Sequence, residues 1–221
     1  LQRLRLGRTD FEDLAFVART RKGRLLPSSV AGTVAGAPFT ASVALDLQAQ
    51  PPMTSLDLSA GAIDIGALLR GLGVAEDIDG HAQAFQLSVL GHGSSLGDWV
   101  GNSAIDARVQ GGSVTVRGAA QRAISEIRVE EARIGAKAGE PVRAWLEGEI
   151  DETPVRIEVT SGTLADFAND ASRVPFALAA QAAGTQLALD GEVTLPLGSG
   201  GKLRFEMRGE RLDSLSDLAR G

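Results

Sequence analysis

Residues 154–162 read PVRIEVTSG, in which Val155, Ile157 and Val159 alternate with polar side chains. KLRFEMRG (202–209) has the same pattern, with apolar and charged residues in turn. Successive side chains of a β-strand point to opposite faces of a sheet. A period of two therefore predicts strands with one apolar face and one face in water.

The alternation recurs along most of the chain in short segments that stop at Gly, Pro, Asp or Ser, which is typical of strands joined by turns. These segments are PFTASVALDL (38–47), TSLDLSAG (54–61), AFQLSVLG (84–91), AIDARVQGG (104–112), SVTV (113–116), SEIRVEEARIGAKAG (125–139), RVPFALAAQAAG (173–184), TQLALDG (185–191) and EVTLPLG (192–198). The sequence predicts a mainly β protein with an antiparallel sheet.

One hairpin pattern is repeated. GTVAGAPFTASV (32–43) and GEIDETPVRIEV (148–159) each predict a strand, a four-residue turn ending in Pro, and a second strand. Residues 191–205 resemble a third copy with a longer turn. Repetition of a short unit is typical of an elongated array in which each unit contacts its neighbours.

Short helices are predicted between groups of strands. IDIGALLRGLG (63–73) places Ile65, Leu68, Leu69 and Leu72 on one helical face. Three further segments share a hydroxyl residue, Leu, and Asp three residues after the hydroxyl residue: SSLGDW (94–99), GTLADF (162–167) and DSLSDL (213–218). Ser or Thr at the N-cap and Asp in the first turn stabilise a helix start. We therefore interpret these phrases as helix caps rather than catalytic motifs.

The composition is that of a folded protein, with 43% hydrophobic and 23% charged residues and no cysteine. We expect a single β-groove-like domain over residues 1–221, with irregular connections at 48–54 and 118–125. The chain starts at Leu1 rather than Met, and we expect it to be a fragment of a longer chain.

Charge is distributed unevenly. Seven basic and three acidic side chains lie in residues 1–24, a net charge of +4, although the whole chain carries −6. This segment is either a solvated strand face or a membrane-proximal segment that faces anionic headgroups. Nucleic-acid binding is not expected, because the rest of the chain is acidic and aromatic residues are not interleaved with the cations.

Catalytic and metal-binding patterns are weak. The two histidines, His81 and His92, do not form an HExxH motif or another helical metal-ligand pair. GHGSSLG (91–97) lacks the spacing of a nucleophile elbow. We expect no enzyme activity, no metal and no cofactor; a hydrolase site near His92 and Ser94 is the least favoured alternative.

The apolar face of the predicted sheet must pack against something. Either a second sheet covers it as a sandwich, or the sheet curls into an apolar-lined groove. Small aliphatic side chains favour a groove that holds a flexible hydrocarbon chain, because a sandwich core needs larger residues to fill its interior. The predicted lining residues are Ile105, Val109, Val114, Val116, Val155, Ile157, Val159, Leu187, Leu189, Leu203 and Phe205.

The chain resembles the AsmA-like family of Gram-negative envelope proteins, which includes TamB and is related to bridge-like lipid-transfer proteins. The resemblance rests on LDLSAGAIDIGALLRGLG (56–73), on GHAQAFQLSVLGHGSSLGDWVGNSAIDARVQGGSVTV (80–116), and on matching phrases within 154–221. It implies an elongated, twisted sheet curled into an apolar groove in the periplasm, anchored to the inner membrane through a segment absent from this chain.

The resemblance further implies a role in phospholipid transport or outer-membrane homeostasis. The expected function is a non-enzymatic lipid-binding module, with phospholipid or another acyl-chain lipid as ligand and membrane or envelope proteins as partners. The alternative is a structural or interaction β-repeat module, a sandwich or solenoid, whose core is filled by its own side chains.

Overall fold

The computed structural model describes residues 3–6, 9–71, 78–116, 126–168, 173–194 and 200–209. The elements in chain order are β1 (Arg3–Leu6), β2 (Thr9–Arg21), β3 (Arg24–Val34), β4 (Ala37–Asp46), β5 (Met53–Ala60), β6 (Ile63–Asp64), α1 (Ile65–Gly71), β7 (Ile78–His92), α2 (Leu96–Gly101), β8 (Ala104–Val116), β9 (Ile127–Ala136), β10 (Pro141–Ile150), β11 (Thr153–Thr163), α3 (Leu164–Ala168), β12 (Arg173–Ala182), β13 (Thr185–Thr194) and β14 (Gly201–Gly209).

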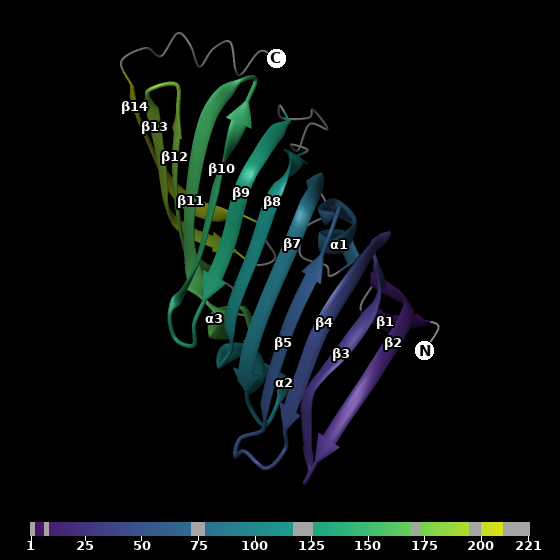
Figure 1. Ribbon diagram of the computed structural model, residues 1–221. Helices are drawn as coiled ribbons and strands as arrows, with labels where there is room; N and C mark the ends of the chain where they lie inside the picture. The colour runs from purple at the N-terminus through teal and green to yellow at the C-terminus, as the bar shows by residue number, and fades with distance from the viewer. Residues whose placement is uncertain are drawn as a thin grey trace.

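All strands in these ranges belong to one antiparallel sheet. Thirteen of them follow one another in chain order from β1 to β14, and the short β6 pairs with β7 beside this path. Figure 1 shows the strands side by side in an elongated, twisted sheet, with β1 and β14 at opposite ends. The described strands do not close the sheet into a barrel, and the prediction of a mainly β, open antiparallel fold is confirmed.

The strand register aligns the apolar residues into continuous rows, because residues opposite each other in antiparallel strands lie on the same face. The central row crosses twelve strands from β2 to β14 with one apolar residue on each. Its members are Phe16, Val30, Ala41, Leu58, Leu87, Ala107, Ile134, Ala144, Val159, Leu178, Leu189 and Phe205.

The repeated hairpins have tighter turns than the sequence predicted. The prediction of four-residue turns ending in Pro38 and Pro154 was wrong, because both prolines lie inside strands, opposite Thr33 and Glu149. Each turn has two residues with positive φ, 47° and 76° at Ala35-Gly36 and 48° and 64° at Asp151-Glu152. Such turns match the right-handed twist of the strands they join.

Two predicted strand breaks at glycine were also wrong. Residues 104–116 form the single strand β8, because Gly111 and Gly112, with φ of 61° and 140°, continue the strand with an unchanged register to both neighbours. A Cβ at Gly112 would lie 2.1 Å from the carbonyl oxygen of His81. Likewise, β13 continues through Gly191, which has a φ of 151°, as far as Thr194.

The predicted helices and caps are found in the described residues. The helix predicted over 63–73 is α1 at Ile65–Gly71, but Ile63 and Asp64 form the strand β6, and residues 72–73 lie outside the described ranges. Ser95 is the N-cap of α2, and its hydroxyl accepts a hydrogen bond from the Asp98 backbone N–H (3.1 Å). At α3, the Asp166 carboxylate accepts hydrogen bonds from the backbone N–H (2.7 Å) and the hydroxyl (2.9 Å) of Thr163. The third phrase, 213–218, lies outside the described residues.

The irregular connection predicted at 48–54 corresponds to residues 47–52, and Met53 already begins β5. The connection predicted at 118–125 lies outside the described residues.

Candidate functional site: an apolar groove

The eleven predicted lining residues occupy one face of the sheet. The register places all of them, Val116 included, in rows with other apolar residues, and ten have described side chains. Val155 is buried, Leu203 and Phe205 are exposed, and the other seven are half-buried. They therefore lie together over strands β8 to β14, with much of their surface in reach of a ligand.

Ile134 shows most clearly that the face is open. It lies on β9, an internal strand that pairs with β8 and β10, and its side chain is 48% exposed. Its neighbours in the central row are Ala107 and Ala144, which are too small to cover it. An internal apolar position this exposed indicates that no second sheet and no helix of the described part of the chain packs over it.

A second row runs parallel to the central row. It contains Gly32, Phe39, Ala60, Phe85, Val109, Ala132, Leu146, Ile157, Ala180, Leu187 and Met207. Small and large side chains alternate along parts of both rows. Together the two rows form the floor of the groove, which continues across the sheet without a charged residue.

Several floor residues were not predicted from the sequence, among them Ile134, Leu146 and Leu178. Leu178 and Ile134 alternate with polar or small residues in their segments, so the same period of two would have identified them. Leu146 follows Trp145, and two adjacent large apolar residues leave the inward position ambiguous. The register resolves it, because Trp145 faces Arg133 and Glu158 on the polar side of the sheet.

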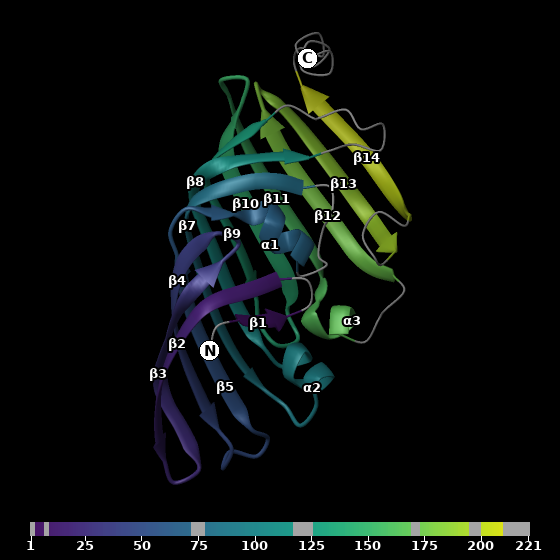
Figure 2. The ribbon, with the colours of Figure 1, turned by 90° about the vertical axis from the view of Figure 1, so that its right-hand side faces the viewer.

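The N-terminal part of the groove is filled by the protein itself. Phe39, Ala60, Ile63 and Ala82 are buried in one cluster, against which Ile65 and Leu68 of α1 pack. Phe11 of β2 meets Phe39 edge-on, with ring centroids 5.9 Å apart. Figure 2 shows α1 and the other two labelled helices inside the curve of the sheet.

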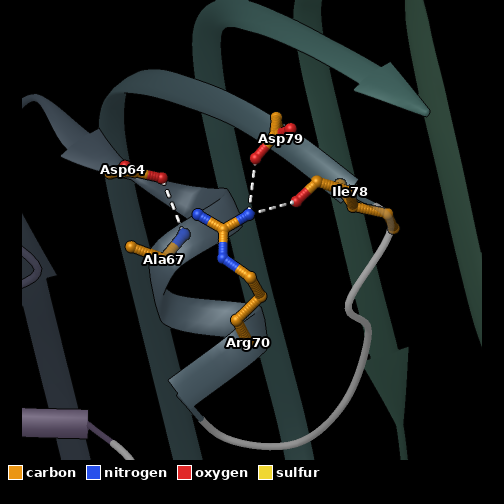
Figure 3. Close-up of polar contacts among 5 residues, drawn as sticks. All are labelled: Asp64, Ala67, Arg70, Ile78 and Asp79. Carbon is orange, nitrogen blue, oxygen red and sulfur yellow. Dashed lines mark hydrogen bonds and ion pairs between the residues drawn. The ribbon is translucent and has the colours of Figure 1, made fainter. Parts of the chain in front are cut away.

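Polar contacts fix α1 in this position (Figure 3). The Asp64 carboxylate accepts a hydrogen bond from the Ala67 backbone N–H at the helix start (2.7 Å). The Arg70 guanidinium donates to the backbone carbonyl of Ile78 (3.1 Å) and to the Asp79 carboxylate (2.5 Å). Arg70 therefore joins the last turn of α1 to the first residues of β7.

Helices α2 and α3 pack against each other at the opposite strand ends, although β9 and β10 separate their parent strands in the sheet. Gly101 of α2 approaches Ala165 of α3 closely, since a Cβ at Gly101 would lie 3.3 Å from the Ala165 Cβ. Leu164 and Val174 are buried beside this contact. The α2–α3 pair thus bounds the groove on one side. The side chain of Ile134 is not covered by this pair.

The other face of the sheet carries ion pairs between neighbouring strands. Arg128 pairs with Glu149 at 2.9 Å, and Arg133 pairs with Asp106. The hydrogen bond and the charge of Asp106 raise the pKa of Arg133 above its usual value. Exposed pairs of this kind contribute at most about 1 kcal/mol each, and they keep this face solvated.

The catalytic alternative finds little support in the geometry. His81 Nδ1 lies 3.2 Å from Ser113 Oγ on the polar face, and His92 is exposed at the end of β7. The Ser94 hydroxyl donates a hydrogen bond to the Asp98 carboxylate (3.0 Å), so it belongs to the cap of α2. Within the described ranges, no three His, Asp or Glu side chains are arranged to hold a metal ion.

Among the helices that the structure describes, none is both long and apolar enough to span a bilayer.

No protein-family model, curated protein or solved structure matches the chain.

Proposed function

We propose that this chain is a non-enzymatic lipid-binding module of a cell-envelope protein, whose groove holds acyl chains for phospholipid transport or outer-membrane homeostasis. The observation that carries the proposal is the exposure of Ile134. Its side chain is 48% exposed, although it lies on an internal strand in the middle of the apolar central row. An apolar surface that is continuous and uncovered is a favourable site for a hydrocarbon ligand.

The length of the groove suits an acyl chain. Six strands, β8 to β13, carry the floor from Ala107 to Leu189. At about 4.8 Å between strands, this distance is about 24 Å, longer than the ~15 Å that one leaflet contributes to a bilayer's hydrocarbon core. Each buried CH₂ stabilises the complex by about 0.8 kcal/mol, so a chain in the groove recovers much of what it loses on leaving the bilayer.

The resemblance to AsmA-like proteins supplies the setting of the proposal. A groove of this kind would stand in the periplasm, anchored to the inner membrane, with phospholipid as ligand and envelope proteins as partners. Headgroups would remain in water while acyl chains lie on the floor.

The alternative is a structural β-repeat module without a ligand. The cluster beneath α1 supports it for the N-terminal strands, because Phe39, Ala60 and Phe85 are covered by α1 and β6. It does not explain the uncovered floor around Ile134.

Site-specific photo-crosslinking separates the two functions. Benzoylphenylalanine at Ile134 should crosslink to phospholipid in protein purified without detergent, because the side chain faces the groove. The matched control is the same substitution at Trp145, which lies on the adjacent strand and on the opposite face. Lipid adducts at position 134 but not at 145 support the proposal; equal labelling, or none at 134 in folded protein, favours the structural module.

A further inference from the structure

Four cations lie at the turn between β2 and β3, and three of them have no ion pair among the described residues. Arg19, Arg21, Lys22 and Arg24 lie within six residues at the end of this hairpin, and all four are exposed. Only Arg24 has an ion pair in the described part of the chain, with Asp46 at 3.0 Å. The same Asp46 carboxylate also accepts hydrogen bonds from the backbone N–H groups of Gln48 and Ala49.

Most arginines elsewhere on the charged outer face of the sheet differ from these cations in having ion pairs. Six arginines further along the sheet are paired with carboxylates: Arg108, Arg128, Arg133, Arg156, Arg204 and Arg208. Arg19, Arg21 and Lys22 have no carboxylate within ion-pair distance among the described residues. The cations at the turn therefore form a local positive surface on a protein of net charge −6.

Large apolar side chains are exposed at the same place. Val17 and Leu47 are each 61% exposed, and Leu26 and Met53 are also exposed. The register places Arg21, Arg24, Asp46 and Met53 opposite one another across four strands, so Met53 shares a face with the cations.

The structure also brings the two connections of this region together. A Cβ at Gly23 in the β2–β3 turn would lie 3.5 Å from Nε2 of Gln48 in the β4–β5 connection. Figures 1 and 2 both show these connections side by side at one end of the sheet. We call the set Val17, Arg19, Arg21, Lys22, Leu26, Leu47 and Met53 the basic tip.

We infer that the basic tip docks on the surface of an anionic bilayer. Cations that flank exposed aliphatic side chains suit such a surface, because the cations are attracted to anionic headgroups while the aliphatic side chains enter the interface. The charge of the tip is complementary to that surface. Binding at the tip does not depend on lipid in the groove, since the strand residues of the basic tip are on the opposite face of the sheet.

Vesicle flotation tests this inference with the full chain. We expect binding to phosphatidylcholine vesicles that contain phosphatidylglycerol, weakening with salt, and little binding to phosphatidylcholine alone. Each cation contributes about a fivefold change in partitioning, so Arg19→Gln/Arg21→Gln/Lys22→Gln should weaken binding about a hundredfold. The matched control, Lys137→Gln/Arg143→Gln/Lys202→Gln, removes the same charge elsewhere and should have a much smaller effect.

Insertion is tested with an environment-sensitive dye, because a chain without cysteine accepts a single label. A dye on Leu47→Cys should shift to the blue on anionic vesicles, whereas a dye on Gln186→Cys, at the far end of the sheet, should not. No binding by the folded protein, or equal loss in both triple variants, would overturn the inference. Cation-dependent binding with no shift at position 47 would also overturn it, because the aliphatic side chains would then stay in water and the tip would act only as a site for polyanions.

Discussion

Asp98 acts at the scale of a single residue by fixing the start of a helix that is too short to be stable alone. Its carboxylate accepts a hydrogen bond from Ser94, and its backbone N–H donates to Ser95. The hydrogen bonds from Ser94 and then Ser95 lower the pKa of Asp98 below its usual value. The cap, and not a catalytic function, accounts for the serines in SSLGDW.

The lowered pKa sets a direction for pH dependence. Ionised Asp98 stabilises the folded state above its unfolded pKa of about 3.9, and this contribution is lost as the pH falls through the lower folded pKa. Carboxyl NMR titration should therefore give Asp98 a midpoint below the usual value, and Ser94→Ala should raise it. A midpoint unchanged by Ser94→Ala would contradict the cap; Ser29→Ala is the control.

At single positions, the sequence predicts which face most strand residues occupy, because apolar and polar types alternate. It does not predict their exposure. Ile134 is open because Ala107 and Ala144 lie opposite it, and the β9–β10 register includes a shift between Glu147 and Gly148. These are long-range pairings that no local pattern contains.

At the scale of elements, helix α1 divides the floor into a covered and an open part. Its position depends on contacts between Arg70 and the start of β7 and on the cap at Asp64. The helix itself was predicted from its apolar spacing, but its docking was not, because the polar partners of Arg70 lie on the next strand. Strand β10 was predicted only from residue 148 onward, because Trp145 and Leu146 interrupt the alternation.

Loosening α1 should lengthen the open groove. Asp64→Ala removes the cap and should lower the free energy of unfolding by about 1 kcal/mol. Arg70→Gln removes a partly exposed ion pair and should cost less than about 1 kcal/mol. The double variant should bind more of a fluorescent fatty acid per chain than the wild type, because Phe39 and Ala60 become accessible.

Urea unfolding and a fluorescence titration measure the two effects, with Arg143→Gln as a control that leaves α1 in place. Unchanged probe stoichiometry, in a double variant whose α1 amides exchange rapidly with solvent, would show that the covered part of the floor binds no lipid.

At the scale of the whole molecule, the sheet has an apolar floor within its curve and a charged outer face. The three helices of the described ranges lie on the floor side, and the strand residues of the basic tip lie on the outer face at one end. The open antiparallel sheet was predicted from alternation, and the groove was predicted from small side chains and from the resemblance. The part of the floor that α1 covers could be identified only from the tertiary structure.

If the floor around Ile134 holds acyl chains, protein purified without detergent should retain lipid. Mass spectrometry of organic extracts of such protein measures it. We predict stoichiometric phospholipid in the wild type and in Leu90→Asp, which alters an equally exposed residue on the outer face. We predict loss of that lipid in Ile134→Asp and Ile157→Asp, with the β circular dichroism spectrum retained. A folded wild type without lipid, or folded groove variants with unchanged lipid, would show that the floor around Ile134 does not hold acyl chains.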